Sequence, residues 1–194
     1  YRTSHQIRLA ADRLLDPEMS DVDGNQETRR GTVSVFNGPT PEIRVGKSSE
    51  EEVRLVAEWL GDLAALGVSP HEVAIIVRSP AELPRARSMA TAAGLETSNL
   101  DDETGHASET IAIAPMHRAK GLEFRAVVVG CCDDEVIPSQ ARISEVTDSA
   151  DLSEVYNTER HLLYVACTRA RDYLLVSGVA PASEFLDDLA IGPL

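Results

Sequence analysis

The spacing of hydrophobic residues changes between two periods along the chain, and it predicts strands that alternate with helices. Several stretches carry apolar residues at helical spacing and are bounded by residues typical of helix ends. Short runs that are apolar throughout are typical of strands buried on both faces of a parallel sheet. The expected helices are 5–15, about 48–67, 81–93, 152–170 and 185–189, and the expected strands are 32–36, 73–77, 110–114, 126–129 and 173–176.

This order of elements predicts the fold class. Strands alternating with helices imply an α/β fold in three layers, with a mostly parallel sheet and helices on both faces. A length of 194 residues suits one domain. Residues 16–30 and 139–151 are polar and acidic, and we expect them to be solvated surface loops rather than partner surfaces. Ligands in such sheets usually bind beyond the carboxyl ends of the strands.

Charge and composition narrow the class of protein. A formal net charge of −14 argues against a free-standing nucleic-acid binder, but it permits a domain that touches DNA through a few residues beside a basic partner. No apolar run approaches the roughly 20 residues of a membrane helix, and no signal peptide begins the chain. The three cysteines lack metal-ligand spacing and suggest reduced thiols in a cytoplasmic protein. Because the first residue is not Met, we expect a piece of a longer protein.

A polar loop joins the strands expected at 110–114 and 126–129, and it concentrates positive charge. Arg118, Lys120 and Arg125 lie there with His117 in an otherwise acidic chain. Gly121 permits a positive φ or a close approach of another backbone. Cations and backbone N–H groups at a strand end suit phosphate groups. A tight turn with solvated cations explains the local composition equally well.

A second segment, 159–170, places Arg169 at the end of the longest expected helix. An arginine in such a position suits an arginine finger, because its planar guanidinium is always charged and binds phosphate with two donors. By composition alone the favoured alternative is an Arg that neutralises the helix C-terminus or pairs with Asp172.

Three segments together resemble one protein family. Residues 117–124, His-Arg-Ala-Lys-Gly-Leu-Glu-Phe, resemble motif V of UvrD/Rep/PcrA-like superfamily 1 DNA helicases, residues 159–170 resemble their motif VI, and Tyr1-Arg2-Thr3-Ser4 resembles motif IV. Pro115-Met116 departs from the family's Thr-hydrophobic pair, which puts a contact from that Thr to a DNA phosphate in doubt here. His161 replaces a usual arginine, so a secondary ion pair is expected to be missing.

The resemblance implies the C-terminal RecA-like motor domain, called 2A, of a DNA helicase: a RecA-like three-layer α/β/α sandwich that is P-loop NTPase-like but lacks the P-loop. It implies that Arg2 and Arg169 act on the γ-phosphate of ATP, that Gly121 and Glu123 approach the nucleotide, that His117 and Arg118 face single-stranded DNA, and that Lys120 belongs to the loop coupling the two. About thirty residues separate 77 from 110, too few for the family's 2B insertion as a typical domain, so 2B is absent or vestigial.

The chain contains neither a G-x-x-x-x-G-K-[ST] segment nor a Walker B segment. The resemblance implies that the N-terminal RecA-like domain of the same parent chain supplies these and mainly holds ATP and Mg²⁺. The favoured function is therefore half of an ATP-dependent DNA translocase. The alternative is a non-catalytic helicase-like scaffold, which the acidic charge and the two departures favour slightly and the retained Arg2 and Arg169 oppose.

Overall fold

The computed structural model describes residues 3–15, 36–100 and 109–190. Arg2, the expected loop 16–30 and most of the expected strand 32–36 lie outside the described residues. The strands are β1 (Glu42–Gly46), β2 (Val73–Val77), β3 (Glu96–Asn99), β4 (Thr110–Pro115), β5 (Phe124–Val129) and β6 (Ala170–Val179). The helices are α1 (His5–Asp12), α2 (Ser49–Ala65), α3 (Leu83–Ala92), α4 (Gln140–Ser144), α5 (Ser149–Cys167) and α6 (Phe185–Leu189), with short 3-10 helices η2 (Pro70–Glu72), η3 (Pro80–Glu82) and η4 (Met116–Arg118).

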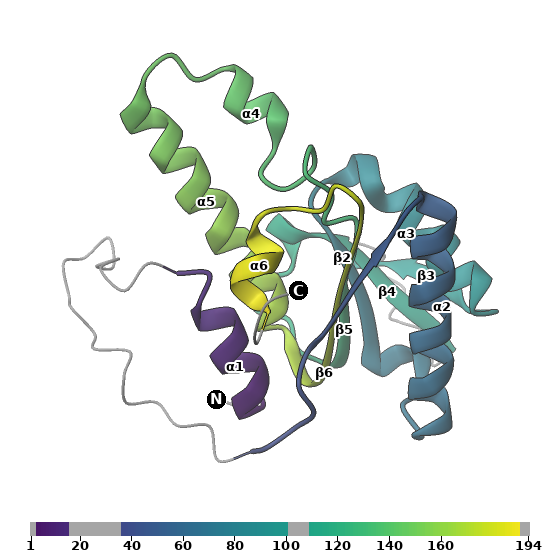
Figure 1. Cartoon of the computed structure of the whole chain (residues 1–194). Coiled ribbons are helices and arrows are strands. Elements are labelled where there is room, and N and C mark those ends of the chain that lie inside the picture. Colours follow the sequence, from purple (N-terminus) through teal and green to yellow (C-terminus); the bar gives the residue numbers. More distant parts are fainter. Residues whose placement is uncertain (1–2, 16–35, 101–108, 191–194) are drawn as a thin grey trace.

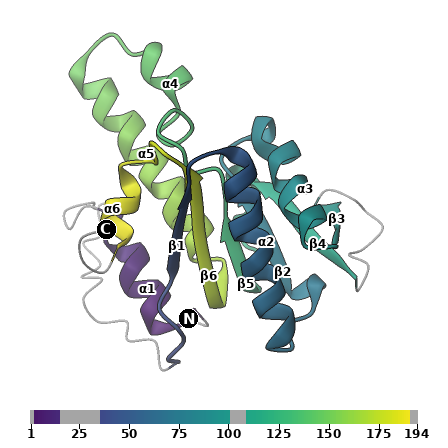
Figure 2. The ribbon, with the colours of Figure 1, turned by 45° about the vertical axis from the view of Figure 1, so that its right-hand side comes forward.

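The strands form one sheet in the order β1-β6-β5-β2-β4-β3, and every pairing between these strands is parallel (Figure 1). The central strand β2 is buried along its whole length, as its apolar run predicts. Side chains alternate between the two faces of the strands. Ile75 and Val128 therefore pack in the core beneath α2 and α3, whereas Ile76 and Val127 pack beneath α1, α5 and α6. Figure 2 shows these helices on both sides of the sheet. The predicted three-layer α/β fold is confirmed.

The sequence pattern missed the two edge strands. β1 carries Glu42 and Arg44, and β3 is Glu-Thr-Ser-Asn. Edge strands pair on one side only and remain partly exposed, so they need no apolar run. Their position in the sheet, which the local sequence does not encode, makes them strands.

The segment 139–151, expected to be a surface loop, is largely helical. It forms α4 and the first turn of α5. Asp148 begins α5 earlier than the apolar pattern predicts, because its carboxylate accepts hydrogen bonds from the N–H groups of Ala150 and Asp151 at 2.9 Å. In Figures 1 and 2, α4 and the first turns of α5 extend away from the sheet as an arm. The arm has few apolar side chains to bury, so helical periodicity is weak there.

The cysteines pack as small apolar side chains. Cys131, Cys132 and Cys167 are free and buried. Burial raises the pKa of Cys167 to about 12, so the thiol is held protonated. Within the described ranges, no helix combines the length and apolarity needed to cross a bilayer.

A buried carboxylate fastens α2 to the carboxyl edge of the sheet. Glu52 is completely buried, and its oxygens accept hydrogen bonds from the Arg85 guanidinium at 2.6 Å, the Cys131 N–H at 3.0 Å and the Ser177 hydroxyl at 2.8 Å. The same Arg85 donates two hydrogen bonds of 2.7 Å to Asp133. One cation thus neutralises two carboxylates from different segments, as a buried charge requires.

A second buried carboxylate does the same for α5. Glu159 is completely buried, and its carboxylate accepts two hydrogen bonds of 2.6 Å from the Arg78 guanidinium. Arg142 of α4 donates to the same carboxylate at 3.0 Å, and the Ser139 N–H donates at 3.3 Å. Burial acts to raise the pKa of Glu159, but the two arginines outweigh it, and the pKa is lowered below the ordinary 4.5.

We predict that Glu159→Gln lowers the free energy of unfolding by about 3 kcal/mol near pH 7, because Arg78 loses its counter-charge in a buried setting. Chemical denaturation measures this loss. The exposed Glu154 on the same helix is the matched control, and Glu154→Gln should change stability by less than about 0.5 kcal/mol.

The same pair predicts a pH dependence. Because the folded-state pKa of Glu159 lies below 4.5, its ion pairs stabilise the fold fully above that pH, and the contribution is lost as the pH falls through the folded-state pKa. The stability gap between the parent chain and Glu159→Gln should therefore narrow below about pH 4.5. A gap that is constant down to pH 3 would contradict this assignment.

Candidate functional site

The segments that resemble motifs V and VI meet at the amino edge of the sheet. Arg169 lies in the turn between α5 and β6, and Glu123 immediately precedes β5. The Phe124 N–H donates to the Arg169 carbonyl at 3.0 Å, which starts the pairing of β5 with β6. Residues 121–123 and 169 thus stand before strands, not beyond their carboxyl ends, where ligands of parallel sheets were expected. At the carboxyl ends of β2, β5 and β6 lie the ion pairs of Glu52 and Glu159.

The Arg169 side chain joins the two segments. Its Nε donates to the Val165 carbonyl of α5 at 3.0 Å, one Nη donates to the Leu122 carbonyl at 3.1 Å, and the other lies 3.3 Å from the Thr168 hydroxyl. Burial lowers the pKa of Arg169, and the nearby Tyr164 and Glu123 oppose that shift. The sequence predicted a helix that runs to residue 170, but the helix ends at Cys167. Arg169 therefore belongs to the following turn.

Arg169 was expected, as alternatives to a finger, to neutralise the helix C-terminus or to pair with Asp172, and only the first role matches its contacts. The bond to Val165 satisfies a carbonyl in the last turn of α5, as an Arg at a helix C-terminus does. Asp172 instead receives hydrogen bonds from Arg171 at 3.0 Å and from Arg125 at 3.3 Å. The guanidinium is half-buried and touches two motif segments at once. These contacts make the Arg169 guanidinium a direct link between the segment that resembles motif V and the segment that resembles motif VI.

The beginning of the described chain reaches the same place. The Thr3 hydroxyl donates to the Thr168 carbonyl at 3.2 Å, and the Ser4 N–H donates to the Arg171 carbonyl at 2.8 Å. Thr3 and Ser4, which follow the expected Arg2, are therefore tied to Thr168 and Arg171, on either side of Arg169 in the sequence. Arg2 itself lies outside the described residues.

The loop that resembles motif V spans the sheet. It leaves the carboxyl end of β4 at η4 and returns to the amino end of β5, and β2 lies between these two strands. Met116 and Ala119 are buried in the core that α5 covers. His117, Arg118 and Lys120 are exposed. The loop thus hides its apolar residues beneath α5 and presents its cations to solvent.

Gly121 serves this loop through its backbone conformation. Its φ is +85°, and a Cβ built there would meet no atom within 4 Å. Of the two roles expected for Gly121, the positive φ is observed, and no group of the described chain approaches closely. The turn leaves Glu123 exposed at the start of β5.

A cavity of about 420 Å³ opens beside this turn. Its wall includes both charged signs, from Glu72, Glu123, Arg125 and Arg171, together with His71 and three apolar side chains. Within the described part of the chain, no group of three or more His, Cys, Asp or Glu is placed to hold a metal ion. The turn thus provides cations and hydrogen-bonding groups, but no metal cage, to a bound molecule.

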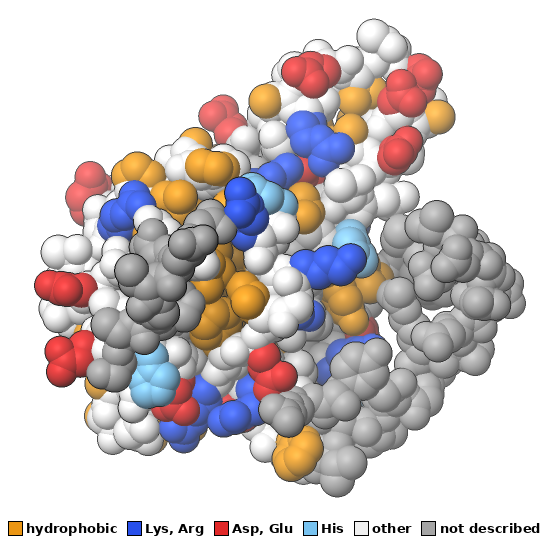
Figure 3. Space-filling view, turned by 180° about the vertical axis from the view of Figure 1, so that it is seen from behind, with side chains coloured by type: hydrophobic (Ala, Val, Ile, Leu, Met, Phe, Trp, Pro, Cys, Tyr) orange, Lys and Arg blue, Asp and Glu red, His pale blue; other side chains and the backbone are white. Residues whose placement is uncertain are grey.

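One face of the molecule departs from the acidic average. Figure 3 shows Lys and Arg side chains around an exposed apolar patch in the middle of the back face, whereas acidic side chains lie mainly at the rim and on the arm. A net charge of −14 therefore coexists with a locally basic surface.

Two other residues of the 159–170 segment, Arg160 and His161, make contacts that hold the fold together. Arg160 forms an ion pair with Asp188, and its guanidinium lies 4.3 Å from the centre of the Phe185 ring. It therefore fastens α6 to α5. The exposed His161 stacks on Tyr164 with the ring centres 6.1 Å apart.

Comparisons with known proteins agree with this geometry. The model of the family described as UvrD-like helicase C-terminal domain matches residues 85–180. The ATP-dependent DNA helicase UvrD1 of Mycobacterium tuberculosis H37Rv is 38% identical over 77 residues, which are 40% of this chain and 9% of that protein. The ATP-dependent DNA helicase srs2 of Schizosaccharomyces pombe is 34% identical over 82 residues, 42% of this chain and 8% of that protein.

A solved structure covers nearly the whole chain. It is the C-terminal domain of a possible DNA helicase from Lactobacillus plantarum WCFS1, with a TM-score of 0.68 and 25% identity over 98% of this chain and 94% of that one. The chain spans only 8–12% of the length of the curated relatives that it matches. The matched family, the shared motifs and the shared fold agree: the chain belongs to the family of UvrD-like helicase C-terminal domains.

Proposed function

We propose that the chain is the second motor domain of an ATP-dependent DNA helicase or translocase and completes an ATP site on a first, P-loop-bearing motor domain. The observation that carries the proposal is the hydrogen bond from Arg169 to the Leu122 carbonyl. It joins the expected arginine finger to the expected coupling loop. The relatives named above are ATP-dependent DNA helicases by name.

In this proposal Arg169 stabilises the negative charge that develops on the transferring γ-phosphoryl group. The guanidinium is half-buried and held close to its position by the end of α5, so little ordering remains when it binds. Arg2 would add a second cation. Glu123 and Gly121 would approach the nucleotide from the turn before β5, and ATP and Mg²⁺ would be held mainly by the P-loop domain.

The contact between Arg169 and Leu122 also supplies a coupling route. A guanidinium that turns toward a phosphate gives up donors now used by the Leu122 carbonyl and the Thr168 hydroxyl. The loop 116–123 would then gain freedom to shift. His117 and Arg118 lie at the far end of that loop, and Lys120 lies between them and Leu122. We infer that their binding to single-stranded DNA changes with the state of the nucleotide.

The first prediction concerns ATP hydrolysis. The isolated chain should show no DNA-stimulated ATPase, because it contains no P-loop or Walker B segment. In a protein that joins it to its P-loop motor domain, Arg169→Ala should lower kcat by roughly 10³-fold or more, the scale of an arginine finger, with single-stranded DNA binding largely kept. Steady-state ATPase and DNA-binding assays measure both.

Arg54→Ala is the matched control, because Arg54 is an exposed arginine on α2 and its removal changes the net charge equally. It should leave kcat unchanged. A near-normal kcat in Arg169→Ala would remove Arg169 from the mechanism. A joined protein without any ATPase would favour the scaffold alternative.

The second prediction concerns DNA. Arg118→Ala should weaken binding of oligothymidylate to the chain and reduce the slope of log K against log salt by about 1, because one phosphate contact is lost. Fluorescence anisotropy at several salt concentrations measures the slope. Arg54→Ala removes the same charge away from η4 and should leave the slope unchanged. Equal effects of the two substitutions would mean that only net charge matters.

A further inference from the structure

The turn that carries Arg169 is held by a segment far from it in the sequence. The Thr3 hydroxyl donates to the Thr168 carbonyl at 3.2 Å, and the Ser4 N–H donates to the Arg171 carbonyl at 2.8 Å. Both bonds come from the two residues that precede α1, a helix that begins beside the start of β6 (Figure 2). We call these two residues the entry segment.

The backbone of Arg169 is fixed by three different segments. Its N–H donates to the Ala166 carbonyl of α5 at 3.1 Å, and its carbonyl accepts from the Phe124 N–H of β5 at 3.0 Å. The Thr3 hydroxyl holds the carbonyl of Thr168, which belongs to the same planar peptide as the Arg169 N–H. The hydroxyl therefore keeps this peptide from rotating about its hydrogen bond to α5.

The side chain of Arg169 can turn while this backbone stays in place. Its three hydrogen bonds go to uncharged oxygens, the Val165 and Leu122 carbonyls and the Thr168 hydroxyl. Hydrogen bonds to uncharged oxygens are weaker than those to a phosphate, so a phosphate can replace them. The direction from which the guanidinium then approaches the phosphate depends on the peptide that Thr3 holds.

The entry segment is itself packed tightly against its surroundings. Ser4 is only 2% exposed. A Cβ at Gly38 would lie 2.8 Å from the Ser4 Cβ and 3.1 Å from the Asp172 carbonyl oxygen, so a side chain at 38 would push on both. The His5 N–H donates to the Phe36 carbonyl at 2.7 Å on the same side. The entry segment is thus clamped between residues 36–38 and the start of β6, and it gives the Thr3 hydroxyl a fixed base.

We propose that Thr3 is a positioning residue of the ATP site: its hydroxyl fixes the peptide from which Arg169 projects, and so sets the direction in which the guanidinium meets the γ-phosphate. The proposal rests on the proposed function, since it needs Arg169 to act on that phosphate. Fixing the backbone in advance raises kcat, because less ordering remains to be done in the transition state. ATP binding would depend on Thr3 only slightly, because the P-loop domain would mainly hold the nucleotide.

The test uses the protein that joins this chain to its P-loop motor domain. Thr3→Val removes the hydroxyl and keeps the branched shape, so it should lower the kcat of DNA-stimulated ATP hydrolysis about fivefold, the effect of one ordinary hydrogen bond. The KM for ATP should change by less than about twofold, because the lost interaction acts in the transition state. Thr3→Ser keeps the hydroxyl and should restore kcat to within about twofold of the parent protein.

Thr158→Val is the matched control. The Thr158 hydroxyl also donates to a main-chain carbonyl, that of Glu154 at 2.9 Å, but it lies about three turns of α5 before Arg169. The substitution should leave kcat unchanged. Thermal unfolding of the joined protein checks that each variant is folded.

A double substitution separates positioning from support of the fold. Because Thr3 acts through Arg169, Thr3→Val should have no further effect on kcat once Arg169 is replaced by Ala. A further loss in that background, or a loss that Thr3→Ser does not restore, would overturn the positioning role. So would a normal kcat in Thr3→Val beside a strongly reduced kcat in Arg169→Ala, a result that leaves the proposed function intact. A near-normal kcat in Arg169→Ala, or a joined protein without ATPase, would overturn the proposed function and the role of Thr3 with it.

Discussion

The buried carboxylate of Glu159 decides where α5 lies, and much of the site depends on that helix. A completely buried charge requires counter-charges at short range, and Arg78 after β2 and Arg142 on the arm supply them. The helix therefore cannot slide along the sheet without leaving a buried charge unpaired. Arg169 follows the end of this helix, so its distance from the coupling loop is set by a contact nearly three turns away.

The carboxyl edge and the amino edge of the sheet have different roles, because buried ion pairs occupy only the carboxyl edge. Ion pairs centred on Glu52 and Glu159 fill the carboxyl ends of β2, β5 and β6, and they leave that region packed. The proposed catalytic groups lie at the amino ends of β5 and β6, where a turn and a helix end meet. The loop 116–123 runs between the edges with its apolar residues under α5. In the proposed function, a shift at one end of this loop would be passed to the other end through its buried residues.

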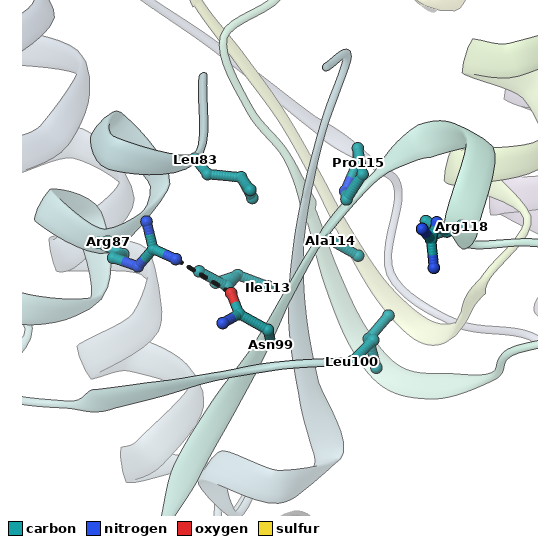
Figure 4. A pocket seen from close by; sticks show the side chains of 8 residues that line it. All are labelled: Leu83, Arg87, Asn99, Leu100, Ile113, Ala114, Pro115 and Arg118. Atoms are coloured by element: carbon teal, nitrogen blue, oxygen red, sulfur yellow. Dashed lines mark hydrogen bonds between the residues drawn. The ribbon is translucent and has the colours of Figure 1, made fainter. Parts of the chain in front are cut away.

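The net charge of the chain did not reveal its locally basic surface. On the face shown in Figure 3, acidic side chains lie mainly on the arm and at the rim, whereas Arg87 and Arg118 line a cavity with apolar walls (Figure 4). In the proposed function, these few cations would suffice for contact with a strand despite the acidic average. The acidic remainder would limit non-specific binding, because it repels phosphate outside this region.

The sequence alone determined the parallel core and the family. Strands such as 73–77 carry that information locally, because burial on both faces demands an unbroken apolar run. The motifs around Gly121 and Arg169 could also be found in the sequence, because each is a continuous run of residues. The edge strands, the ion pairs of Glu159 and the cavity beside Arg87 were decided only by the tertiary structure. They depend on which segments become neighbours, and a glutamate in a helix has the same local pattern whether an arginine eighty residues away meets it or water does.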